Sequence, residues 1–275
     1  MNALMRTLLL RPAQAALMAA SALKGHPVGG VSVLIYHQVG GDVRSELDVD
    51  PCVFAAQLAH LAASGRIMSL PESLAALGAG GPRDGRAFVL TFDDGYADFH
   101  LTVFPQLVAR GIPATVYVTT GFVEGEHSPL SGRRPPAVRP MTWEMLRDLH
   151  GSGLVTVGAH SHAHRDYVGL TEREVEVDID RSSELFERHL GFVPRHFAYP
   201  RARFNAVAEA VVRRRYASAA VGGGARAVPG AFDPHRIPRV PIRRSDGMFF
   251  FRAKVRGLLG AEERLAELVR AALGR

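Results

Sequence analysis

The sequence predicts an α/β fold in which parallel strands alternate with crossover helices. Apolar runs with the length of buried strands recur along the chain, at residues 31–36, 89–92, 114–119, 154–159 and 196–200. Helical patterns with start and stop signals lie between them, at residues 51–61, 69–77, 97–110, 143–150 and 171–190. This alternation is typical of a parallel sheet covered by helices. We therefore expect the carboxyl ends of the strands to meet at one edge, where α/β proteins assemble active sites.

The length and composition fit one globular domain. The chain has 275 residues, of which 47% are hydrophobic, enough for a single α/β barrel-type core. We expect this domain to span residues 31–275, with residues 1–30 as an N-terminal extension. The only cysteine, Cys52, excludes an intramolecular disulfide and favours a reducing compartment. Because Cys52 opens an apolar helical pattern, we expect it to pack in the core.

The charge is basic and comes almost entirely from arginine. The formal net charge is +6, and lysine occurs only at positions 24 and 254. A basic surface favours anionic partners such as phospholipid headgroups or lipid-linked pyrophosphates. Because no motif that combines aromatic and basic residues accompanies the charge, we expect no nucleic-acid partner.

Residues 1–30 have a mixed character. The apolar run at residues 8–10 begins like an export signal, but Arg11 and Pro12 interrupt it. No stretch reaches the roughly 20 apolar residues that a membrane span needs. We expect an amphipathic helix that rests on the domain or on a membrane surface, with a degenerate export signal as the alternative. The lack of a complete export signal favours a cytoplasmic protein, and the expected amphipathic helix leaves peripheral membrane contact open.

Capping residues predict where the helices begin. Pro51 lies in the first turn of the first helix of the domain, and Thr142 is the N-cap of a later one. Thr171 and Glu174 form a capping box that opens the longest helical pattern. Near the C-terminus, residues 249–270 form a basic amphipathic pattern that we expect to be a helix packed on the barrel wall.

Two adjacent carboxylates follow the strand at residues 89–92. Asp93 and Asp94 precede Gly95, so both acids lie at the carboxyl end of a buried strand. Neighbouring carboxylates repel each other, and a divalent cation would stabilise the pair if one acid bound it and the other acted as a general base. Taken alone, such a pair is more often two solvated acids that cap the next helix.

A histidine cluster follows the strand at residues 154–159. His160 and His164 are four residues apart, and on one helical turn this spacing points both side chains the same way, as metal ligands require. With one carboxylate of the Asp93-Asp94 pair, they would supply three ligands and leave a position for water. A single histidine is more often a surface or core residue, but three in five residues after a strand favour a metal site.

The two motifs occur together in a known family. The segment Thr91-Phe92-Asp93-Asp94-Gly95, followed by His160-Ser161 and His164, resembles the first two motifs of the NodB-type polysaccharide deacetylases, carbohydrate esterase family 4. The resemblance covers roughly residues 31–245, because residues 34–39 and 197–200 are similar to the subgroup that includes the poly-N-acetylglucosamine deacetylases. It implies a distorted (β/α) barrel, a divalent metal and hydrolysis of an N-acetyl group on a sugar.

The resemblance also implies roles for individual residues. Asp94, His160 and His164 would bind the metal, which we expect to be Zn²⁺ or another divalent cation. Asp93 would be the general base that takes a proton from the attacking water.

The chain departs from the family pattern after the strand at residues 196–200. Most deacetylases have Arg-x-Pro-Tyr there, whereas this chain has Ala198 in place of the arginine and Arg201 in place of the tyrosine. The backbone amide of Arg201 would still hold the oxyanion, because a backbone amide survives any change of side chain. Since the motif arginine is lost, we expect Arg239, from a late strand-like segment, to orient Asp93.

The strand at residues 31–36 delivers His37 to the same edge. In the subgroup, a Tyr-His strand near the N-terminus replaces a histidine that most relatives carry near the C-terminus, and residues 246–275 contain no histidine here. We therefore expect His37 to be the general acid that protonates the departing amine. The simpler alternative is a histidine that is hydrogen-bonded at a strand end.

The sequence therefore predicts metal-dependent removal of N-acetyl groups from amino sugars of a glycan or glycoconjugate. The substrate is left open between an N-acetylated sugar polymer and lipid-linked or nucleotide-linked glycans. Two other functions stay open. One is a catalytically weak carbohydrate-binding homologue, which the altered segment at Arg201 favours. The other is a metal-dependent phosphoesterase, which would need a second metal.

Overall fold

The structure is a computed structural model that describes residues 30–41, 45–82, 86–126, 129, 138–223 and 226–257. The predicted N-terminal extension up to residue 29, and the predicted C-terminal helix from residue 258 onward, lie outside these residues.

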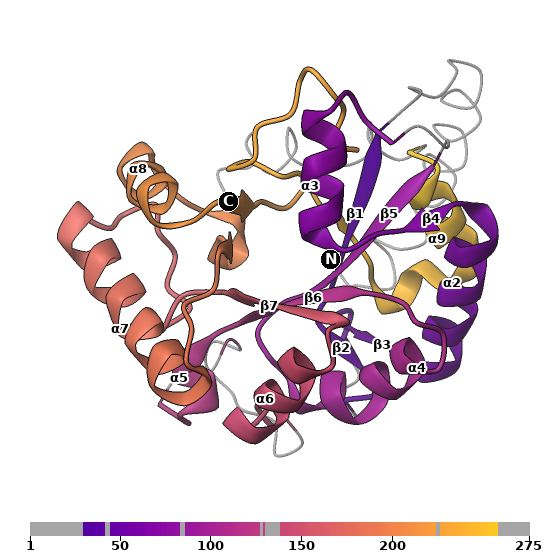
Figure 1. Ribbon diagram of the computed structural model, residues 1–275. Coiled ribbons are helices and arrows are strands. Elements are labelled where there is room, and N and C mark those ends of the chain that lie inside the picture. The colour runs from indigo at the N-terminus through magenta and orange to yellow at the C-terminus, as the bar shows by residue number, and fades with distance from the viewer. Residues whose placement is uncertain are drawn as a thin grey trace, which may run out of the picture.

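A curled sheet forms the centre of the molecule, and Figure 1 shows helices on its outside. Its strands are β1 (Val31–Tyr36), β4 (Arg66–Ile67), β5 (Ala87–Phe92), β6 (Ala114–Val118), β7 (Val155–Ala159), β8 (His196–Ala198), β9 (Ser218–Ala220) and β10 (Val240–Pro241). The order is β10-β1-β5-β6-β7-β8-β9, with β4 paired to the start of β5, and all of these pairings are parallel. This arrangement matches the predicted distorted (β/α) barrel.

The segment around Ile237 joins the two edges of the sheet. Its amide donates to the carbonyl of Ala219, and its carbonyl accepts from the amide of Val221, both at 2.9 Å. Three residues later, Val240 pairs with β1. The chain therefore runs from the β9 edge to the β1 edge, and Arg239 lies between the two pairing points.

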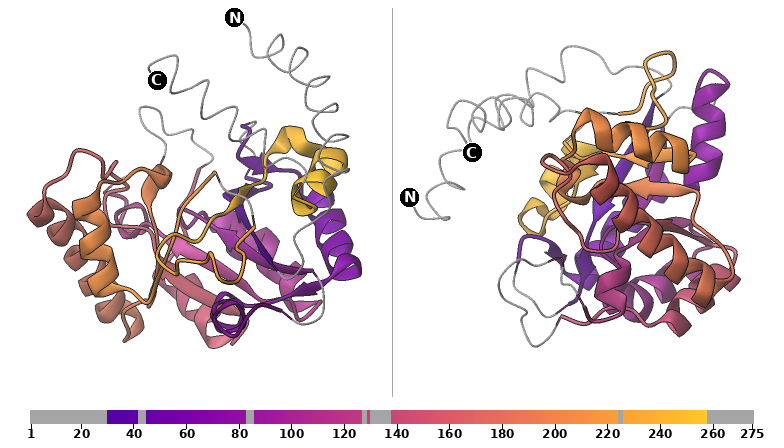
Figure 2. Two further views of the ribbon diagram at one scale, coloured as in Figure 1. Left: turned by 90° about the horizontal axis from the view of Figure 1, so that it is seen from above. Right: turned by 90° about the vertical axis from the view of Figure 1, so that its left-hand side faces the viewer.

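Helices cover the sheet, and the views in Figure 2 show them on several sides of it. They are α2 (Pro51–Ser64), α3 (Leu70–Gly78), α4 (Phe104–Val108), α5 (Thr120–Val123), α6 (Trp143–Gly151), α7 (Glu172–Leu190), α8 (Ala206–Arg215) and α9 (Gly247–Val255). Shorter elements are the π-helix η1 (Phe99–Val103), the turns η2 (Pro200–Ala202) and η3 (Arg244–Asp246), and a two-stranded sheet of β2 (Gln38–Val39) and β3 (Asp48–Val49). Within the described residues, no helix is long and apolar enough to cross a bilayer.

The predicted caps explain where the main helices begin. The Thr142 side chain accepts a hydrogen bond from the amide of Met145, and Thr171 and Glu174 form the capping box at the start of α7. Gly191 ends α7 in the left-handed conformation, with φ of 76°. These local signals fix where α6 and α7 begin, and the two helices precede and follow β7 and its histidine cluster in the chain.

The strands are buried on both faces, which explains their continuous apolar runs. All six residues of β1 and of β5 are buried. Tyr36 and Phe92 stack at 5.1 Å between ring centroids, and Phe99 packs on Phe92 at 4.7 Å, directly beneath the segment that carries the two aspartates. The core therefore reaches up to the carboxyl ends of β1 and β5.

The helix expected at residues 97–110 is confirmed over residues 97–108, although its middle part, η1, is a π-helix, because Pro105 has no amide hydrogen to continue a regular α-helix. Two other local predictions need correction. Within the described residues, the helix predicted at 249–270 is interrupted after Val255, where α9 ends and Gly257 turns the chain with φ of 74°. Cys52 is exposed in the first turn of α2 rather than packed in the core.

Candidate active site

The residues singled out in the sequence come together at the carboxyl ends of the strands. His37 follows β1, Asp93 and Asp94 follow β5, and the histidine cluster follows β7. The backbone is unusual here. The non-glycine residues with positive φ in the described chain are Asp94, Ser161, His164, Arg201 and Ala202, and all of them lie in loops that follow β5, β7 or β8. Such conformations cost about 1–3 kcal/mol each and are typical of functional sites, where the surrounding structure holds them.

Asp94, His160 and His164 form a compact group of metal-ligating side chains. Asp94 Oδ1 lies 3.5 Å from His160 Nε2 and 3.2 Å from His164 Nε2, and all three residues are buried. One ligand atom from each lies within 4.8 Å of the others. Burial would raise the pKa of the Asp94 carboxyl, but the two imidazoles hold it well below its ordinary value. The group is therefore anionic on one side and rich in nitrogen lone pairs on the other.

The donor set of this group fits a divalent cation. Asp94 Oδ1 is buried and accepts no hydrogen bond of good geometry from the described residues. A buried carboxylate oxygen without a partner is costly, and a cation would compensate it. His160 Nδ1 lies 2.8 Å from the carbonyl oxygen of Ala198, which favours the tautomer with hydrogen on Nδ1 and leaves Nε2 free to bind a metal. The observed residues therefore suit a divalent metal ion.

The loop that carries the two histidines is held by α7. Asp178 accepts hydrogen bonds from the amides of His162 and Ala163, at 3.2 and 2.9 Å, and from the hydroxyl of Tyr167. The His164 amide donates to the Ser161 hydroxyl at 2.9 Å. The expectation that both histidines lie on one helical turn was wrong, because residues 160–166 form an irregular loop. Positive φ at Ser161 and His164 brings the imidazoles together instead.

His162, the middle histidine of the cluster, is used differently. Its Nδ1 lies 3.0 Å from the hydroxyl of Thr120, and its Nε2 lies 3.1 Å from a carboxylate oxygen of Glu126. The ring therefore ties the loop after β7 to α5 and the residues that follow it. The histidine count in the sequence favours a metal site, but only two of the three rings face Asp94.

Asp93 is held by a buried arginine, Arg239, from the segment between β9 and β10. Arg239 donates from its two terminal nitrogens to the two carboxylate oxygens of Asp93, at 2.6 and 2.8 Å. Its guanidinium lies 5.3 Å from the ring centre of Tyr117, and only 1% of the residue is exposed. Burial would raise the Asp93 pKa, but the charges of Arg239 and His160 keep it below its ordinary value. The structure thus brings together the pair that the sequence predicts.

His37 faces the same group of charges. Burial lowers the pKa of its imidazole, although the charges of Asp94 and Asp93 oppose this shift. Its Nδ1 is buried and has no hydrogen-bond partner among the described residues, so this nitrogen gives no support to the simpler expectation of a hydrogen-bonded histidine at a strand end. The role of His37 as general acid stays a prediction.

Arg201 lies in a tight turn after β8. The residue is exposed and has φ of 54°, in a tight turn closed by a hydrogen bond from the Ala202 amide to the Tyr199 carbonyl at 3.0 Å. This turn follows β8, whose last residue, Ala198, accepts the hydrogen bond from His160. Arg201 therefore follows, by three residues in the chain, the residue whose carbonyl contacts His160 of the metal-ligating group.

Sequence reasoning missed Asp178, although a signal was present. It lies between Val175 and Ile179 on the buried face of α7, where an acid interrupts the apolar stripe. Polar residues on the buried face of a helix usually have a buried partner. Here the partners are the amides of the histidine loop.

The fold and the site define a class of protein. A parallel (β/α) barrel with one carboxylate and two imidazoles at strand ends, and a second carboxylate beside them, is the arrangement of a metal-dependent hydrolase. A family model described as polysaccharide deacetylase matches residues 80–217, just over half of the chain, and the chain belongs to this family. Its members are metal-dependent hydrolases that remove acetyl groups from carbohydrates. Among curated proteins, YxkH of Bacillus subtilis (strain 168), named as a candidate polysaccharide deacetylase, is 23% identical over 174 residues.

That match covers 63% of this chain and 57% of the length of YxkH. Solved structures cover more of the chain. IcaB from Ammonifex degensii is 25% identical, with a TM-score of 0.70 over 82% of this chain and 97% of that one. The Streptococcus pyogenes deacetylase PplD, in complex with acetate, has a TM-score of 0.69 at 19% identity, over 83% and 99%. A de-N-acetylase from Aggregatibacter actinomycetemcomitans has a TM-score of 0.66 at 22% identity, over 81% and 98%, and like PplD it supports the fold alone.

Proposed function

We propose that this chain hydrolyses N-acetyl groups on amino sugars of a glycan or glycoconjugate, with the help of a divalent metal. The observation that carries the proposal is the pairing of Asp94, His160 and His164 with a second carboxylate, Asp93, which Arg239 holds beside them. Neither the metal-ligating group nor Asp93 would suffice alone, because amide hydrolysis needs both an activated water and a base to receive its proton.

Each residue has a step that its position permits. When bound by Asp94, His160 and His164, a metal ion would polarise the acetyl carbonyl and lower the pKa of a water molecule. Asp93 takes the proton of the attacking water, and Arg239 keeps its carboxylate ionised and oriented. The amide of Arg201 donates to the oxyanion, and His37 gives a proton to the departing amine nitrogen.

We propose zinc as the metal. Two imidazole nitrogens and one carboxylate oxygen form the ligand set of many catalytic zinc sites. Metal analysis of the purified chain, followed by removal with a chelator and titration with Zn²⁺, Co²⁺, Mn²⁺ and Mg²⁺, tests this choice. Zinc should bind one per chain and restore the largest share of the activity, whereas full activity with Mg²⁺ alone would contradict the proposal.

The central experiment is acetate release by chelator-treated protein, with and without added zinc. The acceptors are N-acetylglucosamine oligomers, a lipid-linked N-acetylated sugar and a nucleotide-linked one. Zinc-dependent release from any of them supports the proposed reaction, and the preferred acceptor defines the substrate class. Zinc binding with no release from the three acceptors would favour the carbohydrate-binding homologue, which sugar affinity measurements would then test.

The phosphoesterase alternative has less support. Such enzymes commonly use two metals about 4 Å apart, which requires a second set of ligands. Within the described residues, the only group of three clustered ligands is Asp94, His160 and His164. A stoichiometry of two metals per chain, or hydrolysis of a phosphate ester with no acetate release, would revive this alternative.

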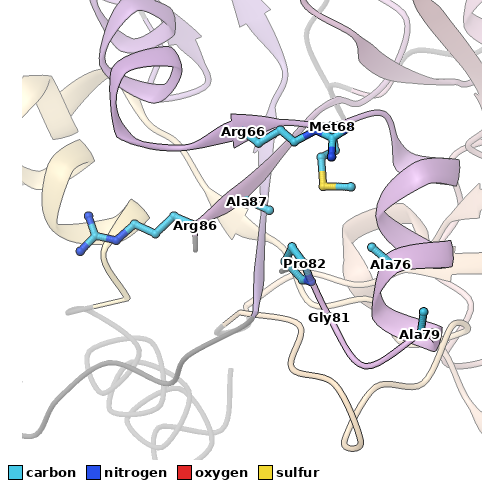
Figure 3. A pocket seen from close by; sticks show the side chains of 8 residues that line it. All are labelled: Arg66, Met68, Ala76, Ala79, Gly81, Pro82, Arg86 and Ala87. Atoms are coloured by element: carbon cyan, nitrogen blue, oxygen red, sulfur yellow. The ribbon is translucent and has the colours of Figure 1, made fainter. Parts of the chain in front are cut away.

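We further propose peripheral contact with an anionic membrane, on the cytoplasmic side, through the end of the barrel opposite the site. Here lies a pocket of about 240 Å³ between α3 and the starts of β4 and β5, and Arg86 extends away from it (Figure 3). Burial and the charges of Arg252, Arg256 and Arg86 lower the pKa of His60, on α2. Cations thus converge where α2, α9 and the start of β5 meet, and anionic headgroups would complement them.

The described fold begins at Gly30, at this same end. Gly30 accepts a hydrogen bond from Arg226, and residues 1–29 contain Arg6, Arg11 and Lys24 but no acid. Sedimentation with neutral and with anionic phospholipid vesicles tests the proposal. The chain should bind only anionic vesicles, and an Arg252→Glu/Arg256→Glu variant should bind less while releasing acetate normally. Equal sedimentation of the two proteins would contradict membrane contact through this cluster.

A further inference from the structure

His37 is positioned by its neighbours in the chain, not by a hydrogen bond of its own. Its Nδ1 has no partner among the described residues, and it is the single residue between β1 and β2. On one side, the amide of Asp93 donates to the carbonyl of Tyr36 at 3.0 Å, which continues the pairing of β1 with β5. The position of the His37 ring therefore depends on what holds the backbone on its other side.

Asp98 holds that other side. The amide of Val39 donates to Asp98 Oδ2 at 2.6 Å, a contact between residues 59 positions apart in the chain. At 2.6 Å this is a short hydrogen bond, and it persists although burial raises the pKa of the Asp98 carboxyl to about 7. Pairing with β3 also holds this backbone, because the amide of Gln38 donates to the carbonyl of Leu47 at 3.0 Å. The Asp98 contact is the one that ties the backbone after His37 to the segment that carries Asp93 and Asp94.

A helix-capping role does not account for Asp98. It immediately precedes the π-helix η1, yet its side chain makes no hydrogen bond to the amides of that helix. Its carboxylate instead reaches across to Val39, and the Gln38 side chain also stabilises it. The position itself is firm, because the next residue, Phe99, is buried and packs on Phe92 at 4.7 Å. A π-helix inside a helical segment is frequently found at a functional site.

We infer that Asp98 is a positioning residue for the reaction, which fixes His37 beside Asp93 and Asp94 by holding the amide of Val39. The inference rests on the proposed role of His37 as general acid. Asp98 itself touches neither substrate nor metal. Its effect on turnover passes through the placement of the His37 ring, since a displacement of about 1 Å can cost on the order of 10²-fold in rate.

The test compares Asp98→Ala, Asp98→Asn, His37→Ala and the His37→Ala/Asp98→Ala double variant. Asp98→Ala should lower kcat between about tenfold and 10²-fold, with KM and bound zinc unchanged. Asp98→Asn should restore most of the rate, because its amide oxygen still accepts from Val39. His37→Ala should lose about 10² to 10⁴-fold, and adding Asp98→Ala to it should change kcat by less than about twofold.

A second readout does not depend on activity. In an ¹⁵N-resolved NMR spectrum of the metal-free protein, the Val39 amide should lie downfield, move upfield in Asp98→Ala and stay in place in Asp98→Asn. This measurement and the melting temperature separate a released hydrogen bond from an unfolded variant.

Several outcomes would overturn the inference. Asp98→Ala with wild-type kcat would show that the contact does not matter for turnover. An equal loss in the wild-type and His37→Ala backgrounds would place the effect of Asp98 elsewhere, as would an Asp98→Asn variant as slow as Asp98→Ala. If His37→Ala kept full activity while wild-type protein released acetate, the general-acid role would fail and the inference with it. Loss of acetate release from the wild type would instead refute the proposed function.

Discussion

The two sides of the site are built in different ways. On the metal side, Asp94, His160 and His164 come from two short motifs that each follow directly from a buried strand. On the acid–base side, Asp93 is held by Arg239, 146 positions away, and the segment of His37 is held by Asp98, 59 positions from Val39. The metal side is therefore encoded in local sequence, whereas the acid–base side depends on how the barrel closes. Single substitutions should therefore disable each side of the site separately.

The largest expected effect is on the metal side. Asp94→Ala removes the only carboxylate of the metal-ligating group and leaves His160 and His164 without their anionic partner. We expect bound zinc to be lost and acetate release to fall by about 10³-fold or more, because the metal contributes several kcal/mol to the transition state. Metal analysis and acetate assays check this. Unchanged zinc content with unchanged activity would refute the assignment of Asp94.

Arg239→Ala should break the acid–base side and spare the metal. It leaves Asp93 as a buried charge without its partner, which is expected to lower the free energy of unfolding by about 3–5 kcal/mol and to slow turnover. Arg236→Ala is the matched control, because this exposed arginine lies three residues earlier and pairs with Glu209, which keeps Arg213 as a second partner. That variant should cost about 1 kcal/mol or less. Denaturant unfolding, zinc content and kcat separate the two variants, and equal destabilisation would argue against a special role for the Asp93 pair.

Much of the metal side was predictable because its signals are short in range. Asp93 and Asp94 follow an apolar run, the histidines follow another, and parallel strands bring their carboxyl ends together. The α/β fold followed from the same alternation of strands and helices. The helical-turn geometry of His160 and His164 was wrong, because positive φ at Ser161 and His164 cannot be read from residue spacing.

The acid–base side was only partly predictable, for a physical reason. Arg239 was expected to orient Asp93 because the motif arginine is replaced by Ala198, but no local pattern gives its distance from Asp93. Asp98 and Asp178 make long-range hydrogen bonds to backbone amides, and such contacts leave no spacing signal in the sequence. The π-helical part of the predicted 97–110 helix follows from Pro105, which was visible in the sequence but was not used.

Arg201 offers a way to sharpen the comparison, because its proposed role belongs to the backbone. Arg201→Gly keeps the amide and relieves a residue with φ of 54°. We expect kcat to stay close to that of the wild type, without the roughly 10² to 10³-fold loss that follows removal of an oxyanion donor. Steady-state acetate release measures this directly. A loss of that size would assign the role to the guanidinium and would also strengthen the case that this chain departs from its family in mechanism.

The smallest effect is expected for Glu209→Gln, on the outside of the barrel. Glu209 on α8 accepts hydrogen bonds from Arg236 and Arg213, and these lower its pKa to about 2. A carboxyl with a depressed pKa stabilises the folded state above its ordinary pKa of about 4.5, and this contribution disappears as pH falls toward 2. Wild type should therefore be more stable than Glu209→Gln near pH 7, by on the order of 1 kcal/mol, and the difference should vanish near pH 2. Thermal unfolding across this range measures the difference, and acetate release at pH 7 should not change. A constant difference between the two proteins at all pH values would contradict an ionic origin of the Glu209 contribution. A carboxylate–guanidinium pair on the outside of the barrel thus contributes only to stability, whereas the buried Asp93–Arg239 pair should affect both stability and turnover.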